Sequence, residues 1–187
     1  MRSIAVYCGS RFGNQPVFES GARLLGSCLA QQGIRLVYGG GNVGLMGAVA
    51  SQAMASGGEV VGVIPSALKD KELAHLGLSE LIVVQDMHER KHKMAELADG
   101  FIAMPGGIGT LEEIFEVWTW AQLGFHGKPC AFYNLNGYFD TLMRFVDQMV
   151  ASEFVSGVYR DMVTVSNDPD AIISAFRSYR PPMEKWR

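Results

Sequence analysis

Two consecutive glutamates follow a glycine-rich loop, an arrangement that offers an anion site with a carboxylate beside it. The loop runs from Pro105 to Thr110 with the sequence PGGIGT, and Glu112 and Glu113 come shortly after it. Glycines let the backbone approach an anion closely, and the free N–H groups of the helix that follows then point at it. Thr110 adds a hydroxyl donor. Because the loop contains neither a lysine nor a metal ligand, it suits a monophosphate better than a magnesium-bound triphosphate.

The same glutamates also have a structural interpretation. Thr110 and Glu113 form T-x-x-E, the pattern of a capping box in which the glutamate satisfies the N–H of the cap residue. The helix dipole alone favours glutamates in the first turn by up to about 1 kcal/mol. Consecutive helical residues point about 100° apart, so Glu112 and Glu113 should have different roles. From these residues alone, cap and catalyst are equal alternatives.

Arg90 is a second position of chemical interest, because it is a cation within an apolar helical stripe. The apolar members of the stripe are Met87, Met94 and Leu97. Their spacing is that of a buried helix face, whereas Lys91 and Lys93 can face water. An unpaired buried guanidinium is costly, so Arg90 needs an anionic ligand or partner. A salt bridge to Glu113 or to Asp99 is the structural alternative.

An earlier glycine cluster, Gly39–Gly44, reads G-x-G-x-x-G after a strand and before a helix. A dinucleotide site also needs an acidic residue at the end of the next strand, and Val63–Ser66 supplies none. We therefore expect no intact nicotinamide site, and the absence of GxxxxGK[ST] excludes a P-loop. The cluster is either a tight turn or a segment that approaches a ligand closely. We favour the second interpretation for Gly40, Gly41 and Gly44.

The elements that must position these residues alternate along the chain. Predicted strands are Ile4–Cys8, Arg35–Tyr38, Val60–Ile64, Ile82–Val84, Phe101–Met104, Cys130–Tyr133 and Met162–Val165. Predicted helices are Pro16–Gln32, a helix that follows the Gly39–Gly47 segment and runs through Ser56, Met87–Ala98, Thr110–Leu123, Tyr138–Val150 and Asp168–Tyr179. Apolar strands separated by helices indicate an α/β fold. We predict one Rossmann-like domain over residues 1–187, a doubly wound parallel sheet with helices on both faces and a peripheral tail from about residue 180. Ligands bind at the carboxyl ends of such strands, where both glycine clusters fall.

Composition narrows the function classes. The 187 residues carry a net charge of −3, with 48% hydrophobic and 19% charged residues, which excludes a disordered chain and provides no basic field for nucleic acid. Three widely spaced cysteines without a CxxC pair predict neither a disulfide framework nor a zinc site. His88 and His92 are spaced to share a metal, but their charged neighbours favour a solvated helix face, and we expect no metal. No run approaches the ~18 apolar residues of a membrane span. We expect a cytoplasmic protein with no membrane partner.

Together these motifs resemble the Lonely Guy (LOG) family of cytokinin-activating phosphoribohydrolases. The matching segments are Tyr7–Ser10, Tyr38–Gly47, Met87–Lys91 and Pro105–Gly124. The resemblance spans most of the chain, roughly from Ile4 to Val155. The motifs in this order and spacing are far more specific than either glycine loop alone.

The resemblance implies hydrolysis of the N-glycosidic bond of a nucleoside 5′-monophosphate, giving a free base and ribose 5-phosphate. The implied substrates are N6-prenylated adenosine monophosphates, with AMP in some members. Arg90 and Glu113 would be the catalytic pair. The implied substrate contacts are Glu72, Arg90, Lys91, Gly106, Gly107, Ile108, Gly109, Thr110, Leu111, Glu112 and Thr119. The resemblance also implies no cofactor, and a homodimer or larger assembly with the site near a subunit boundary. Ile108 stands where plant members usually have an aromatic residue.

Residue chemistry agrees with this implied reaction. Cleavage builds positive charge on the sugar, which Glu113 can stabilise while it activates water, as nucleophile or general base. Arg90 can orient Glu113 and hold the phosphate or ribose hydroxyls. One rival hypothesis is a non-catalytic nucleotide-binding module in which these two residues form a structural bridge. Another is lysine decarboxylase, which needs pyridoxal phosphate on a lysine, and Lys91 and Lys93 lie in a helix without an evident cofactor pocket. Without the resemblance, Glu72 would be a solvated helix charge and Thr119 a space filler between tryptophans.

Overall fold

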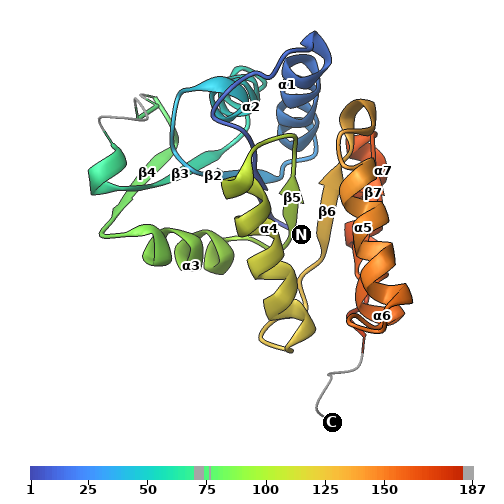
Figure 1. The fold of residues 1–187 in the computed structure, drawn as a ribbon. Helices are drawn as coiled ribbons and strands as arrows, with labels where there is room; N and C mark the ends of the chain where they lie inside the picture. The colour runs from blue at the N-terminus through green and yellow to red at the C-terminus, as the bar shows by residue number, and fades with distance from the viewer. Residues whose placement is uncertain (70–73, 76, 183–187) are drawn as a thin grey trace.

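Seven parallel strands form one continuous sheet in the computed structural model, which describes residues 1–69, 74–75 and 77–182 (Figure 1). The strands are β1 (Ser3–Tyr7), β2 (Arg35–Tyr38), β3 (Val60–Pro65), β4 (Glu80–Val84), β5 (Phe101–Ala103), β6 (Cys130–Tyr133) and β7 (Val163–Ser166). Their order across the sheet is β4-β3-β2-β1-β5-β6-β7. Every neighbouring pair is parallel, as the continuous apolar runs predicted.

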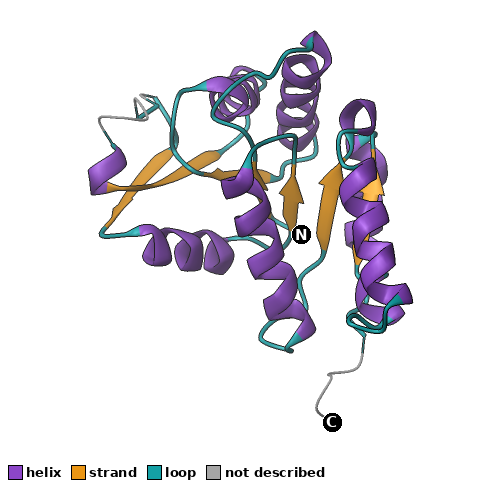
Figure 2. Ribbon diagram, in the orientation of Figure 1, coloured by secondary structure: helices purple, strands orange, loops and turns teal. Residues whose placement is uncertain are grey.

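Helices cover both faces of this sheet (Figure 2). They are α1 (Pro16–Gln31), α2 (Gly44–Ala55), α3 (Met87–Leu97), α4 (Ile108–Gln122), α5 (Asp140–Ala151), α6 (Gly157–Arg160) and α7 (Pro169–Ser178), with 3-10 turns η1 (Ser66–Leu68) and η2 (Leu135–Gly137). Residues of α1, α2 and α7 share one hydrophobic core, and residues of α3, α4 and α5 share the other. Within β1 the side chains alternate, so that Ile4 and Val6 enter the first core while Ala5 and Tyr7 enter the second. The predicted doubly wound α/β architecture is confirmed.

The strand order reverses direction beside β1. From β1 the chain builds outward to β4, then returns through α3 to place β5 on the other side of β1. Loops that leave β1 and β5 therefore run to opposite faces, which opens a crevice at their carboxyl ends. Two backbone hydrogen bonds hold the crevice walls together, from Met104 N–H to Tyr7 O (2.8 Å) and from Gly9 N–H to Pro105 O (3.0 Å).

Helix starts differ from the prediction in two places. Helix α4 begins at Ile108 rather than at Thr110, its cap residue is Gly107, and no side chain caps it. Of the two alternatives for Thr110 and Glu113, the capping box is therefore wrong, and neither glutamate lies in the first turn. A side-chain cap occurs instead at α3, where Asp86 accepts a hydrogen bond from Glu89 N–H at 2.9 Å.

Other elements differ from the prediction at their ends. The single-turn helix α6 was not predicted, and β4 begins two residues before the predicted Ile82. The predicted peripheral tail lies partly outside the described residues, because the structure describes nothing beyond Pro182.

Candidate active site

Six of the predicted site residues line one cavity of about 260 Å³ at the carboxyl ends of β1 and β5. They are Arg90, Gly107, Gly109, Thr110, Glu112 and Glu113. Cys8, Gly9 and Ser10 from the β1 loop form another wall, and apolar side chains of Met46, Leu68 and Met87 complete the lining. The cavity thus combines a cation, carboxylates and a helix start, all brought together from distant parts of the chain.

The glycine loop presents backbone amides to this cavity. The first N–H groups of a helix have no carbonyl partner within it, and in α4 these belong to Ile108, Gly109 and Thr110. A β-carbon placed on Gly106 would overlap the Thr110 hydroxyl, so only glycine fits there. At Gly107, by contrast, a β-carbon would have nothing but its chain neighbours within 4 Å. The loop is therefore tightly packed behind and open in front, as an anion cradle requires.

Arg90 is buried, as its place in the apolar stripe predicted. Its exposed fraction is 6%, its Nη1 approaches Met87 Sδ at 3.8 Å, and its Nε has no hydrogen-bond partner among the described residues. The alternative salt bridge to Asp99 is wrong, because that carboxylate accepts backbone hydrogen bonds from Arg2 and Ser3 at the other end of the sheet. A buried guanidinium with an unsatisfied N–H beside a cavity is suited to an anionic ligand.

Glu113 is half-buried. Its charge and that of Arg90 both affect the titratable side chains at the end of β1. Burial first, and then the Glu113 carboxylate, raise the pKa of the Cys8 thiol, while the Arg90 guanidinium opposes this shift. Tyr7 shows the same pattern, with its pKa raised by burial and by Glu113 and lowered by Arg90. Opposite charges therefore meet at the end of β1. Cys8 stays protonated, which makes it unsuited to act as a nucleophile.

Lys91 was predicted to face water, and this prediction is wrong. Its side chain is buried between α3 and α4, with Nζ 2.5 Å from Glu112 Oε1 and 3.1 Å from Glu116 Oε1. Burial alone would lower the pKa of Lys91, but the hydrogen bonds to Glu112 and Glu116 outweigh it and raise the pKa. Lys93 does reach the surface, where it pairs with Glu96 at 3.0 Å.

The first glycine cluster is crowded by the protein itself. Gly40 packs against Ile64 and Leu81, Gly41 bridges to Ala74, and Gly44 begins α2 against the backbone of residues 10–11. None of the three lines the cavity beside Arg90, so the predicted close approach is to the chain's own atoms rather than to a ligand there. Gly39, the first glycine of the G-x-G-x-x-G pattern, was not among the glycines predicted to approach a ligand, yet it lies against a site residue: a β-carbon on it would overlap the Arg90 guanidinium.

Five further predicted contacts among the described residues do not line this cavity: Lys91, Gly106, Ile108, Leu111 and Thr119. Of these, Thr119 lies exposed on α4. Glu72 lies outside the described residues. The neighbouring Trp118 belongs to the core, and its indole N–H donates to Tyr159 O at 3.0 Å.

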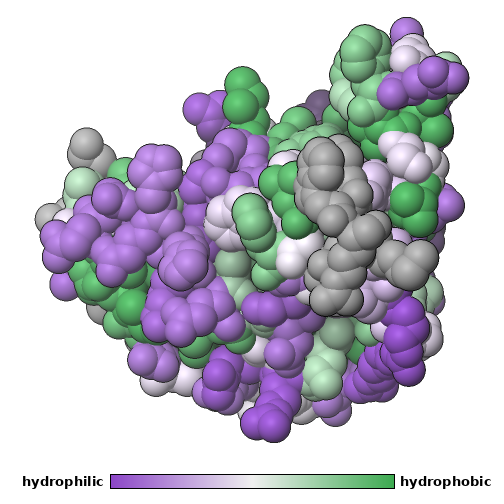
Figure 3. Space-filling model, turned by 90° about the horizontal axis from the view of Figure 1, so that it is seen from below, coloured by the Kyte–Doolittle hydropathy of each residue, from purple (hydrophilic) through white to green (hydrophobic). Residues whose placement is uncertain are grey.

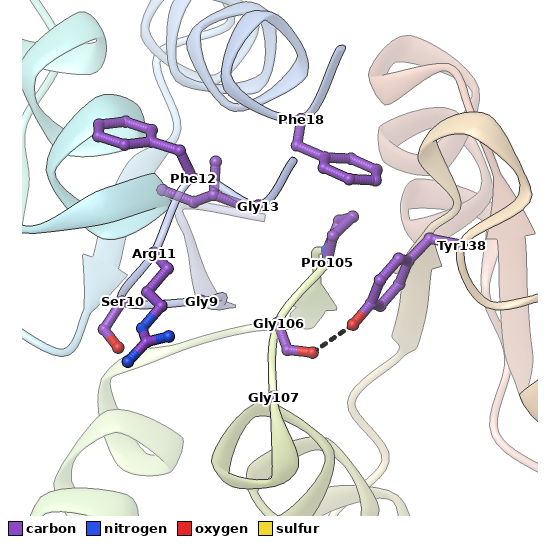
Figure 4. A pocket seen from close by; sticks show the side chains of 11 residues that line it. Gly9, Ser10, Arg11, Phe12, Gly13, Phe18, Pro105, Gly106, Gly107 and Tyr138 are labelled. Atoms are coloured by element: carbon purple, nitrogen blue, oxygen red, sulfur yellow. Dashed lines mark hydrogen bonds between the residues drawn. The ribbon is translucent and has the colours of Figure 1, made fainter. Parts of the chain in front are cut away.

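A second cavity, of about 310 Å³, adjoins the first across the glycine loop (Figure 4). It shares Gly9, Ser10 and Gly107 with the first cavity, and aromatic rings line its far side. These rings belong to Phe12, Phe18 and Tyr138. The Tyr138 hydroxyl donates a hydrogen bond of 2.6 Å to Gly106 O, so this wall also supports the loop. No local sequence pattern marks Tyr138, because it reaches the loop from the segment before α5.

The described residues also bear on the expectations about metal binding and membrane spans. Within them, no group of three or more His, Cys, Asp and Glu side chains is placed to hold a metal ion. Of the helices in the described ranges, none has the length and apolar character needed to cross a membrane.

Comparison with known proteins places the chain in a family. Residues 46–176 match the family model described as "Possible lysine decarboxylase". The chain is 47% identical over 178 residues to a cytokinin riboside 5′-monophosphate phosphoribohydrolase from Rhodococcoides fascians, covering 95% of this chain and 90% of the relative. An Arabidopsis thaliana protein of the same name is 44% identical, with 98% of this chain and 85% of the relative covered.

Solved structures agree with the fold. A protein described as the molybdenum cofactor carrier protein from Chlamydomonas reinhardtii superimposes with a TM-score of 0.72 at 21% identity, covering 94% of this chain and 96% of the other. The molybdenum cofactor binding protein from Rippkaea orientalis gives a TM-score of 0.70 at 22% identity, covering 95% and 96%. At this identity the likeness concerns the fold alone, whereas the closer relatives carry the family assignment. The chain therefore belongs to the family of cytokinin riboside 5′-monophosphate phosphoribohydrolases, the Lonely Guy family.

Proposed function

We propose that the protein hydrolyses the N-glycosidic bond of a nucleoside 5′-monophosphate, releasing the free base and ribose 5-phosphate. The observation that carries this proposal is the single cavity in which the buried Arg90, the Glu113 carboxylate and the amides that begin α4 converge. The names of the relatives from Rhodococcoides fascians and Arabidopsis thaliana support the same reaction and a cytokinin riboside 5′-monophosphate as substrate.

Each group in the cavity has a role in this reaction. The amides of Ile108–Thr110, with the Thr110 hydroxyl, bind the 5′-phosphate. As the glycosidic bond breaks, positive charge develops on the ribose, and the ionised Glu113 stabilises it as nucleophile or activates the attacking water as general base. Arg90 orients Glu113 through its opposite charge and holds a ribose hydroxyl or phosphate oxygen.

The base is the less polar part of the substrate, and the cavity has a matching wall. Met46, Leu68 and Met87 line it, and Met87 is partly exposed beside Arg90. Flexible methionine side chains adapt to irregular apolar surfaces. This wall suits a purine, with or without an N6-prenyl substituent, so both AMP and prenylated adenosine monophosphates are candidate substrates.

Lysine decarboxylation fits the residues poorly. That chemistry requires a lysine amine that forms a Schiff base with pyridoxal phosphate, which starts from the neutral amine. Lys91 does not line the cavity, and its ammonium lies between Glu112 and Glu116 with a raised pKa. Lys93 points to the surface and pairs with Glu96. Neither lysine is set up for that cofactor.

We also propose a homodimer, as the family resemblance implies. Figure 3 views the molecule from below and shows separate hydrophobic patches among the hydrophilic surface. Two large apolar side chains are almost fully exposed, Ile108 at 87% and Phe154 at 86%. Ile108 begins α4 beside the cavity, so a partner that covers it would lie close to the site. Light scattering coupled to size exclusion tests this: a monomer mass would refute it.

The activity itself is tested with three compounds in parallel, AMP, isopentenyladenosine monophosphate and adenosine. Chromatography measures the base released by the pure protein. We expect base from at least one monophosphate and cleavage of adenosine at least about 100-fold slower, because the amide cradle acts only on an anion. Binding of AMP without any base release would favour the non-catalytic module instead. Equal cleavage of AMP and adenosine would refute the phosphate-binding role of the loop.

A further inference from the structure

A charged cluster joins α3 to α4 beside the catalytic pair. Lys91 Nζ lies 2.5 Å from Glu112 Oε1 and 3.1 Å from Glu116 Oε1. Glu112 and Glu116 are four residues apart on α4, so their carboxylates lie on the same face of that helix. Two like charges at this spacing repel each other. The ammonium of Lys91 on α3 attracts both carboxylates and so offsets their mutual repulsion.

Two of the three residues in this cluster are sequence neighbours of the proposed catalytic residues. Lys91 follows Arg90 on α3, and Glu112 precedes Glu113 on α4. Because a helix is stiff over one residue, the contact between Lys91 and Glu112 fixes where Arg90 stands relative to Glu113. The catalytic residues come from different helices, so their separation depends on how those helices are tied together.

Glu116 has a buried oxygen atom whose unfavourable free energy is not explained by a role in folding. Its Oε2 is buried without a hydrogen-bond partner among the described residues, while its Oε1 bonds to Lys91. An unsatisfied buried carboxylate oxygen is unfavourable, and apolar residues often replace buried ion pairs without loss of stability. A carboxylate at this position is therefore better explained by what it holds in place than by a gain in folding free energy.

We propose that Glu116 is a positioning residue: together with Glu112 it clamps Lys91 and so sets the separation between Arg90 and Glu113. Glu116 does not line the cavity, so it acts through Lys91 rather than on the substrate. This inference rests on the proposed hydrolysis and adds to it a residue outside the cavity.

The test compares Glu116→Gln, Lys91→Met and Lys91→Arg with the unchanged protein, using AMP or the better prenylated substrate. Misplacing a catalytic group by about 1 Å can cost about 10²-fold in rate. We expect Glu116→Gln and Lys91→Met to lower kcat about 10-fold to 100-fold with KM changed less than about 3-fold. Lys91→Arg should recover most of the kcat, because its guanidinium can bond both carboxylates. The melting temperatures of the variants should not fall in proportion to their loss of kcat.

Glu96→Gln is the matched control, since it breaks the exposed Lys93–Glu96 pair on the same α3 helix. If Glu116→Gln behaves like Glu96→Gln, the proposal is wrong. A rise in KM at constant kcat would also overturn it, because Lys91 would then contact the substrate directly.

Failure of the proposed hydrolysis is recognised separately, as an unchanged protein that releases no base from any monophosphate. In that case the role of Glu116 is tested by comparing crystal structures of the unchanged protein and of Glu116→Gln. A shift of about 1 Å or more between the Arg90 guanidinium and the Glu113 carboxylate supports the clamp. An unchanged separation refutes it.

Discussion

The backbone of Gly39, at the end of β2, lies directly against the Arg90 guanidinium, so that a β-carbon at position 39 would overlap Nη2. The residue that follows β2 thus lies against the proposed catalytic arginine of α3, although the two are distant in sequence. Because Gly39 has no side chain, the guanidinium of Arg90 can occupy the space beside it. This space allows the guanidinium to lie beside the cavity.

Gly39→Ala tests this relationship. The atom that the new methyl group meets is the end of a flexible side chain, so the arginine can move aside and the free energy of unfolding should change little. Its displacement should lower kcat/KM for nucleoside monophosphate hydrolysis by about 10²-fold. Steady-state kinetics with a denaturant titration measure both effects. The matched control is Gly157→Ala, whose β-carbon would lie 4.0 Å from Val150 Cγ1, an ordinary contact. Equal activity of the two variants would contradict the prediction.

Tyr138→Phe tests the support of the glycine loop from behind. The substitution removes the 2.6 Å hydrogen bond to Gly106 O and leaves the ring in place. A neutral hydrogen bond contributes about 0.5–1.5 kcal/mol, so we expect KM for the monophosphate to rise about 2-fold to 10-fold with little change in kcat. The inhibition constant of ribose 5-phosphate should rise by the same factor, because that product occupies the same amide cradle. An altered kcat with unchanged product inhibition would show that the hydroxyl acts elsewhere.

Strand positions were largely predictable because they depend on burial on both faces. The predicted bounds of β2 and β6 match the structure, since β6 and all of β2 after Arg35 are apolar runs, and a glycine or an asparagine follows each strand. Helix α4 was placed two residues late. Its first turn contains Ile108 and Gly109, and a glycine there resembles loop sequence although the chain is already helical.

Parts of the site that depend on a neighbour distant in sequence could not be predicted. The stripe spacing correctly placed Arg90 on a buried face, but the same pattern assigned Lys91 to solvent. Lys91 is buried only because α4 brings two carboxylates to it. The contact of Gly39 with Arg90 and that of Tyr138 with Gly106 were not predicted for the same reason, since no local pattern encodes either contact.

His126 makes stability depend on pH below neutrality. Its Nδ1 accepts the Lys128 N–H at 3.1 Å, and its ring packs on Phe101. Burial, aided by the Lys128 charge, lowers the pKa of His126 below its ordinary value. The folded state therefore binds this proton less readily than the unfolded state. Stability from this group is complete above about pH 6.5 and is lost as the pH falls through the lowered pKa.

His126→Gln should flatten that dependence. Urea unfolding of both proteins between about pH 7.5 and pH 5.5 measures it, in a range where most carboxylates remain ionised. We expect the free energy of unfolding of the unchanged protein to fall toward the acidic end more steeply than that of the variant. Parallel curves would show that His126 does not titrate differently on folding.

The most direct test of the account is Glu113→Gln, which keeps the shape of the side chain and removes its charge. Base release from the preferred nucleoside monophosphate and the dissociation constant of ribose 5-phosphate, by calorimetry, are measured on the same preparations. If Glu113 supports cleavage as nucleophile or general base, base release falls about 10²-fold to 10⁴-fold while ribose 5-phosphate binds within about 3-fold of the unchanged protein. Turnover near that of the unchanged protein would contradict the assignment of Glu113 and with it the proposed mechanism.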